Sequence, residues 1–162
     1  MADYLALAFA QAQARTGLPF ATVECASGTV VGSTRFWNLE YWSWPAGHPL
    51  RRPEGVPDAV EIGYSWLAPE AQRTAVNTEA KLLMLAHAFE AWQVHRVTLK
   101  TDVRNARSRA AIERLGARLD GVLRAATPAS DGGLRDTAWY SLLRSEWPEV
   151  RERLAARLAA RR

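Results

Sequence analysis

Two stretches of the sequence combine residue types and spacings that could bind or transform a ligand. The first begins with the apolar and aromatic run from Glu61 to Leu67, which predicts a strand, and continues through a polar turn, opened by Gln72, into a long helical pattern. Strand, turn and helix in this order direct unpaired backbone N–H groups and the positive end of a helix dipole at one point. This arrangement suits a pyrophosphate, but every strand-to-helix turn offers part of it, so an ordinary structural turn is the alternative.

The second stretch runs from Asn105 to Gly116 and places Ser108 three residues after Asn105. Together the two stretches resemble the Gcn5-related N-acetyltransferase (GNAT) superfamily. Within it they resemble the RimJ and RimL branch, which acetylates the N-terminal amines of ribosomal proteins. The first stretch is similar to the acetyl-coenzyme A loop, Gln/Arg-x-x-Gly-x-Gly/Ala, with Gln72 in the opening position. The second is similar to the Asn-x-x-Ser helix of this branch and its Leu-Gly-Ala step into a strand.

The resemblance implies direct attack of an amine on the thioester of acetyl-coenzyme A (acetyl-CoA), with no covalent enzyme intermediate and no metal ion. The pantetheine would pair with the strand that ends at Trp66, and the pyrophosphate would lie on the amides of the following turn. A backbone N–H near Trp66 or Leu67 would polarise the thioester oxygen. The residues that the resemblance assigns to acetyl-CoA binding are Trp66, Leu67, Gln72, Arg73, Thr74, Ala75, Val76, Asn77, Thr78, Asn105 and Ser108.

Glu61 and Ser108 are the candidate catalytic residues. Relatives often use an acidic residue near the strand position of Glu61 as a general base, here through a water molecule. The alternative is a solvated glutamate at a strand edge. Ser108 is the candidate acid, or a hydrogen-bond donor to the leaving thiolate. The alternative for this residue is helix-start chemistry, with Asn105 as the N-cap and Ser108 in the first turn.

The acceptor implied by the resemblance is a primary amine, either on a small molecule or at a protein N-terminus. At pH 7, deprotonating an α-amine with a pKa of about 7.8 costs about 1 kcal/mol, against about 4 to 5 kcal/mol for a lysine with a pKa of about 10.4. A modest base therefore suits an α-amine better than a lysine side chain.

Three departures from the family pattern stand out. Ala75 and Asn77 replace loop glycines, which is acceptable only if neither position needs a positive φ. Ile112 stands where many relatives carry a tyrosine acid. The first strand and first helix of the family fold are not recognisable before the helix that begins near Asp3. A non-catalytic acyl-CoA-binding or interaction module is therefore the alternative function.

The periodicity of apolar residues predicts an α/β (α+β) fold with one domain over residues 1–162. The sheet is expected to be mixed, with locally parallel pairing in the middle of the chain. The resemblance implies the acyl-CoA N-acyltransferase fold, in which a mostly antiparallel sheet of about six strands has a splayed central parallel pair and is flanked by helices. We expect strands over residues 18–25, 29–36, 59–67, 95–101, 117–126 and 135–143, and helices over 3–15, 74–92 and 105–115 and from Pro148 onward. A long irregular loop is expected over residues 37–57.

Composition narrows the protein class. With 162 residues, 48% of them hydrophobic and 23% charged, the chain is typical of a soluble globular protein. It has no apolar run of about 18 residues and no basic segment ahead of its apolar N-terminus, so we expect a cytoplasmic protein without a membrane span or signal peptide. The single Cys25 excludes an intramolecular disulfide and a multi-cysteine zinc site, and we expect it to be buried in a strand.

The net charge of +4 does not indicate a nucleic-acid binder. Residues 144–162 carry six arginines and three glutamates, so the rest of the chain has a net charge of only +1. In the arginine-rich segment 104–124, which contains the expected helix over residues 105–115, the arginines form mainly a solvated face, from which Arg109 or Arg114 would meet the phosphates. An aromatic and acidic cluster is predicted to line the acceptor side, the alternative being burial or a homodimer contact; its members are Trp37, Glu40, Tyr41, Trp42 and Trp44.

Overall fold

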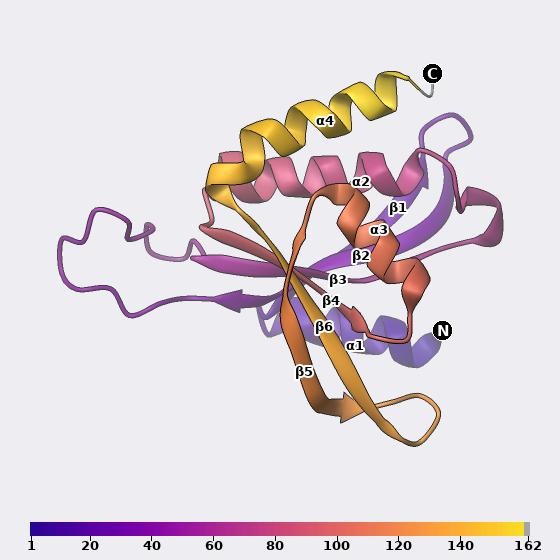
Figure 1. Cartoon of the computed structure of the whole chain (residues 1–162), viewed down its shortest axis with the longest axis horizontal. Coiled ribbons are helices and arrows are strands. Elements are labelled where there is room, and N and C mark those ends of the chain that lie inside the picture. The colour runs from indigo at the N-terminus through magenta and orange to yellow at the C-terminus, as the bar shows by residue number, and fades with distance from the viewer. Residues whose placement is uncertain (161–162) are drawn as a thin grey trace.

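The computed structural model describes residues 1–160 and shows a six-stranded mixed sheet with helices on both faces (Figure 1). The strands are β1 (Gly17–Glu24), β2 (Thr29–Glu40), β3 (Ala59–Leu67), β4 (Arg96–Asp102), β5 (Arg118–Pro128) and β6 (Leu134–Leu143). The α-helices are α1 (Ala2–Gln13), α2 (Val76–Ala86), α3 (Ala106–Leu115) and α4 (Trp147–Ala159). The strand order is β1-β2-β3-β4-β6-β5, and only β3 and β4 run parallel.

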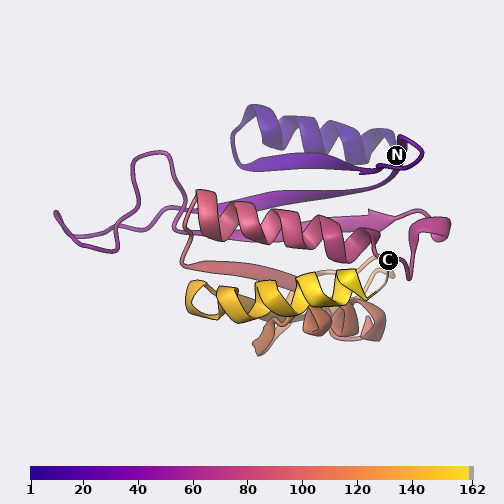
Figure 2. The same cartoon turned by 90° about the horizontal axis from the view of Figure 1, so that it is seen from above.

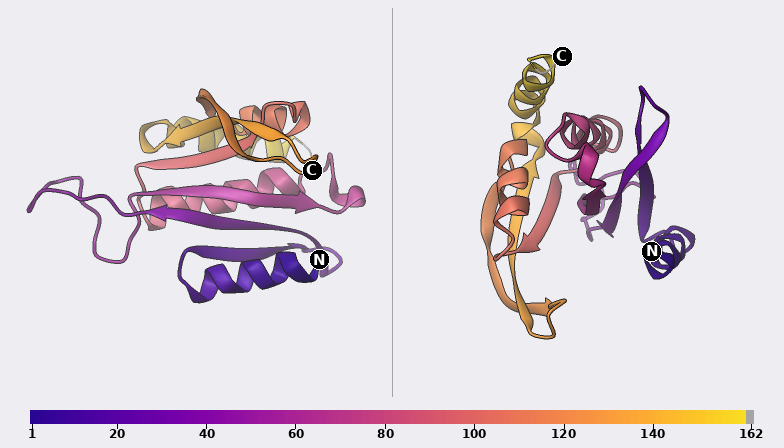
Figure 3. Two further views of the ribbon diagram at one scale, coloured as in Figure 1. Left: turned by 90° about the horizontal axis from the view of Figure 1, so that it is seen from below. Right: turned by 90° about the vertical axis from the view of Figure 1, so that its right-hand side faces the viewer.

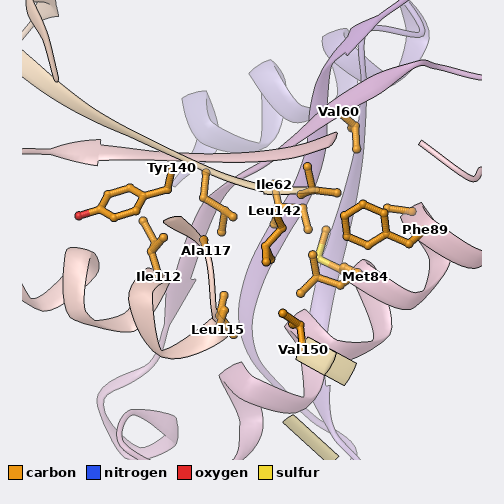
Figure 4. Packing of buried hydrophobic residues seen from close by; sticks show 14 of the residues in the cluster. Val60, Ile62, Met84, Phe89, Ile112, Leu115, Ala117, Tyr140, Leu142 and Val150 are labelled. Atoms are coloured by element: carbon orange, nitrogen blue, oxygen red, sulfur yellow. The ribbon is translucent and has the colours of Figure 1, made fainter. Parts of the chain in front are cut away.

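The hydrophobic core lies between the sheet and the helices α2, α3 and α4. Helix α1 covers the other face of the sheet, beside β1, as Figures 2 and 3 show. Alternation along β3 points Val60 and Ile62 into the core and turns Glu61 to the opposite face. Figure 4 shows Val60 and Ile62 packed with Met84 of α2 and with side chains from α3 and α4.

The predicted elements are confirmed, with shifted boundaries. The helix expected over residues 74–92 is α2 followed by a π-helical turn, His87–Ala91. The long loop begins after Glu40, because β2 continues beyond Phe36. The expectation that Cys25 is buried is wrong: β1 ends at Glu24, so Cys25 falls in the hairpin turn and is exposed.

The parallel pair β3 and β4 separates part-way along its length. Pairing joins Ala59 to Arg96 and Val60 to Val97, and it ends where Glu61 meets Thr98. Beyond that point β4 continues beside β6, while β3 continues beside β2. The edge of β3 after Glu61 therefore faces β4 without a strand partner within residues 1–160, and backbone groups along it are available to a ligand.

A β-bulge lies on this open segment of β3. The pairing of β2 with β3 shifts between Ser33 and Arg35, so that the step from Gly63 to Trp66 opposes a shorter step on β2. Tyr64, inside the bulge, has a φ of 52°. Since bulges re-aim the backbone, this segment presents its amides differently from a regular strand.

Candidate active site

The turn between β3 and α2 has the open amides that the sequence predicted. The backbone N–H groups of Arg73, Ala75, Asn77 and Thr78 donate no hydrogen bond to any acceptor among the described residues. They stand at the start of an 11-residue helix, where the helix dipole favours an anion. Ala75 has a φ of −71°, and the positive φ in this turn, 64°, belongs to Arg73. The alanine and asparagine that replace the family glycines are therefore compatible with the backbone.

Side chains around this turn hold its shape. The Gln72 amide donates from Nε2 to the carbonyl of Leu67 at 2.8 Å and accepts at Oε1 from Arg107 Nη2 at 2.7 Å. The Thr74 hydroxyl donates to the carbonyl of Ala71 at 2.7 Å. Gln72 thus connects the end of β3 to the first turn of α3, and its side chain is already engaged within the chain.

Arg107 is a residue that sequence reasoning missed. Its guanidinium reaches the turn from α3, whereas Arg109 directs Nε to the hydroxyl of Tyr140 at 3.0 Å. The sequence indicated only that several arginines follow one another on α3. Which of them faces the turn depends on how α3 packs against the sheet, through the buried Ile112 and Leu115.

The first turn of α3 confirms the capping alternative for Asn105. Its side-chain oxygen accepts a hydrogen bond from the Ser108 backbone N–H at 2.9 Å, and Gly116 ends the helix with a φ of 98°. The Ser108 hydroxyl is half-buried and has no hydrogen-bond partner within the described chain. Asn105 therefore has a structural role already, and Ser108 keeps a hydroxyl that a ligand could use.

Glu61 lies in a closed environment, not at a solvated edge, so the structural alternative for this residue is wrong. It is 3% exposed, and its Oε2 lies 2.7 Å from Lys100 Nζ on β4. The Lys100 ammonium in turn lies 3.4 Å from the ring centroid of Trp139. Burial raises the pKa of the Glu61 carboxyl above its ordinary value, and the ion pair with Lys100 opposes that rise.

Trp37 closes the same environment from β2, directly across from Glu61. A Cβ at position 63 would lie 2.6 Å from Trp37 Nε1, so Gly63 is what allows the indole to approach the strand. Glu61 occupies the face opposite the one that α3 covers, and it shares no hydrogen bond with Ser108. The two candidate catalytic residues therefore belong to opposite faces of the sheet, and Glu61 stands where β3 and β4 separate.

The remaining predicted residues are placed as follows. Trp66 is 39% exposed and packs edge-on against Tyr4 of α1, so its indole lies outside the hydrophobic core. Trp42 and Trp44 are tied to the buried Asp58, through a backbone N–H and an indole N–H, each at 2.7 Å. Their internal network supports the alternative of packing within the chain for these two side chains.

No helix within residues 1–160 is long and apolar enough to cross a bilayer. No group of three or more histidine, cysteine, aspartate or glutamate side chains gathers there in a way that could hold a metal ion.

Comparison with known proteins decides the family. A family model described as "Acetyltransferase (GNAT) domain" matches residues 1–118. The chain belongs to the GNAT acetyltransferase family. Among curated proteins, this GNAT chain is 37% identical over 98 residues to "Putative ribosomal N-acetyltransferase YdaF" of Bacillus subtilis (strain 168), a match that covers 60% of this chain and 52% of YdaF. The chain thus spans about half the length of this relative.

Solved structures share the fold. Mycobacterium smegmatis RimJ, determined in complex with CoA-disulfide, superposes with a TM-score of 0.74 at 27% identity, covering 98% of this chain and 68% of RimJ. A GCN5-related N-acetyltransferase from Brucella melitensis gives a TM-score of 0.72 at 31% identity, covering 87% of this chain and 57% of that protein. The six-stranded sheet with its central parallel pair is therefore the acyl-CoA N-acyltransferase fold.

Proposed function

We propose that this GNAT domain transfers an acetyl group from acetyl-CoA to a primary amine, with a protein N-terminal α-amine as the favoured acceptor. The observation that carries the proposal is the set of backbone amides of Arg73, Ala75, Asn77 and Thr78, which have no hydrogen-bond acceptor within residues 1–160. It lies directly after the unpaired edge of β3, and the buried Glu61 stands where that edge begins. The sites proposed for the pyrophosphate, the thioester and the general base thereby follow one another along a single segment of the chain.

The binding half of the proposal rests on charge and geometry. The amides of Arg73, Ala75, Asn77 and Thr78 supply donors that have no acceptor in the described part of the chain, and the start of α2 supplies a positive dipole end. The guanidinium of Arg107, fixed through Gln72, brings a full positive charge to the same turn. The pantetheine arm would pair with the open edge of β3 as an added strand would. The donor set therefore fits a diphosphate with an extended amide-bearing arm.

The chemical half assigns roles to Glu61, Lys100 and Ser108. The amine nitrogen of the acceptor forms a bond to the thioester carbon, the carbon–sulfur bond breaks, and sulfur leaves as a thiolate. Glu61, whose pKa burial raises, takes the proton that the amine loses, through a water molecule. Lys100 compensates the Glu61 charge before the transfer. The Ser108 hydroxyl donates to the departing thiolate, whose pKa of about 8.5 calls for only a weak donor.

Two considerations favour an α-amine acceptor. A carboxylate base suits an α-amine better than a lysine side chain, because deprotonating an α-amine with a pKa of about 7.8 costs only about 1 kcal/mol at pH 7. The curated relative YdaF also carries a ribosomal N-acetyltransferase name. An acceptor of that kind would place the reaction in the cytoplasm.

Calorimetric titration with acetyl-CoA tests the binding half, and amine-dependent release of free thiol tests the chemistry. We expect saturable binding, and turnover with peptides that carry a free N-terminus. Absence of binding at high micromolar ligand refutes the proposal. Binding without turnover across a broad amine panel supports instead the alternative of an acyl-CoA-binding module.

A further inference from the structure

Lys81 carries a buried amino group that the proposed chemistry does not use. The chain contains two lysines, and the other, Lys100, is paired with Glu61. Lys81 is 4% exposed in the second turn of α2, and no carboxylate pairs with it among the described residues. Its Nζ donates to the Ser65 hydroxyl at 2.5 Å and to the Thr34 hydroxyl at 2.6 Å.

The two hydroxyls connect Lys81 to the bulge of β3. Ser65 lies inside the bulge, and the Thr34 oxygen on β2 is 2.8 Å from the Ser65 oxygen, so the three groups form a closed triangle. Lys81 is therefore bonded to the strand segment whose other edge is open toward β4. It lies on the core side of that segment, away from Glu61.

A buried arginine holds the bulge from the other face. The Arg35 guanidinium is fully buried, 4.1 Å from the ring centroid of Tyr64 and 4.7 Å from that of Tyr4. The Tyr4 hydroxyl lies 3.1 Å from the Tyr64 carbonyl. Since Tyr64 and Ser65 are neighbours, the bulge is fixed on one face through an aromatic ring and on the other through a hydroxyl.

Stability alone does not explain a lysine at this position. Burying an ammonium without a counter-charge is unfavourable, and an apolar side chain of similar size would fill the same space at lower cost. Ser65 and Thr34 would still satisfy each other without the lysine. What Lys81 adds is a fixed position for Ser65, and with it a fixed direction for the amides of the bulge.

We propose that Lys81 is a positioning residue for acetyl transfer, acting through Ser65 to hold the bulge amides toward the thioester oxygen. The inference rests on the proposed function and on the expectation from the family resemblance that a backbone N–H of β3 polarises that oxygen. Donors of this kind act only when their direction is fixed before the reaction. Loss of the link should therefore slow the chemical step and leave the binding of CoA, which depends on the turn after β3, unchanged.

The test compares Ser65→Ala with Ser65→Thr, which keeps a hydroxyl on a strand-compatible side chain. Leu83→Ala, on the exposed face of α2, is the matched control. We expect Ser65→Ala to lower kcat at least about tenfold. This loss should be smaller than the loss of about a hundredfold or more that follows complete removal of an oxyanion donor, because the amide is still present but less well directed. Ser65→Thr and Leu83→Ala should keep kcat near the wild-type value. The Kd for CoA and the KM for acetyl-CoA should stay within about twofold in all three, and Lys81→Met should reproduce the kcat loss of Ser65→Ala.

The outcomes separate the two proposals. A wild-type chain that binds no CoA and transfers no acetyl group refutes the proposed function and this inference with it. An active wild type with an undiminished Ser65→Ala variant refutes the inference alone. A loss that appears in KM or Kd, or that Ser65→Thr shares in full, also refutes it, because Ser65 would then serve binding or packing and not the direction of the amides.

Discussion

Replacing Lys81 with methionine should change the pH dependence of stability in a defined direction. Burial lowers the pKa of the Lys81 ammonium from 10.5 to about 7. In the unfolded chain the side chain returns to its ordinary value, so between these two pH values the unfolded state binds more protons than the folded state. The free energy of unfolding of the wild type therefore rises with pH across this window.

The size of the effect follows from the shift. Each pH unit inside the window contributes at most about 1.4 kcal/mol, and integration from pH 7 to pH 9 gives about 2 kcal/mol. Lys81→Met removes the titrating group and keeps an unbranched apolar chain in the same space. The variant should be more stable than the wild type at pH 6, and its advantage should shrink by about 2 kcal/mol between pH 7 and pH 9.

Urea unfolding of both proteins at half-unit pH steps, followed by circular dichroism, measures the difference. Every other titratable group is present in both chains, so its contribution cancels in the difference. Leu83→Met, at an exposed position of the same helix, is the control and should run parallel to the wild type. If the wild-type and Lys81→Met curves are parallel from pH 6 to pH 9, Lys81 is not held in the environment described for it.

Three further substitutions separate catalysis, binding and helix capping. Glu61→Gln should lower kcat by about a hundredfold or more while the Kd for CoA stays unchanged, because it removes the base and keeps the shape; an undiminished rate in steady-state assays excludes Glu61 as the base. Arg107→Ala should weaken CoA binding by about fivefold to fiftyfold in calorimetry, since a charge-assisted contact is worth about 1 to 2.5 kcal/mol, and an unchanged Kd would show that the guanidinium only braces Gln72. Asn105→Ala should lower the free energy of unfolding by about 1 kcal/mol through loss of the cap on α3, measured by urea unfolding; an unaltered stability would argue against that cap.

The sequence predicts those parts of the site that depend on local chemistry. The Asn105 cap, the Gly116 helix end and the turn before α2 each follow from a few consecutive residues, and the structure confirms them. Ala59–Leu67 was predicted with its observed boundaries, because an apolar run ends at a proline there.

Other parts depend on partners distant in the chain. The burial of Glu61 requires Lys100 and Trp139 from other strands. Alternation along β3 therefore predicts only the face of the sheet toward which the Glu61 side chain points. Lys81 falls on the same helical face as Leu85, but a lysine is rarely buried, and its hydroxyl partners lie 16 and 47 residues away. No local pattern reveals such a contact.

Backbone amide NMR during titration with CoA is the most direct measurement of how the phosphates are held. The largest shift changes should fall on the N–H signals of Arg73, Ala75, Asn77 and Thr78, moving downfield as these free donors gain acceptors. Saturation with CoA that leaves these four signals unmoved, with the main changes elsewhere on the chain, would contradict the assignment of the pyrophosphate to this turn.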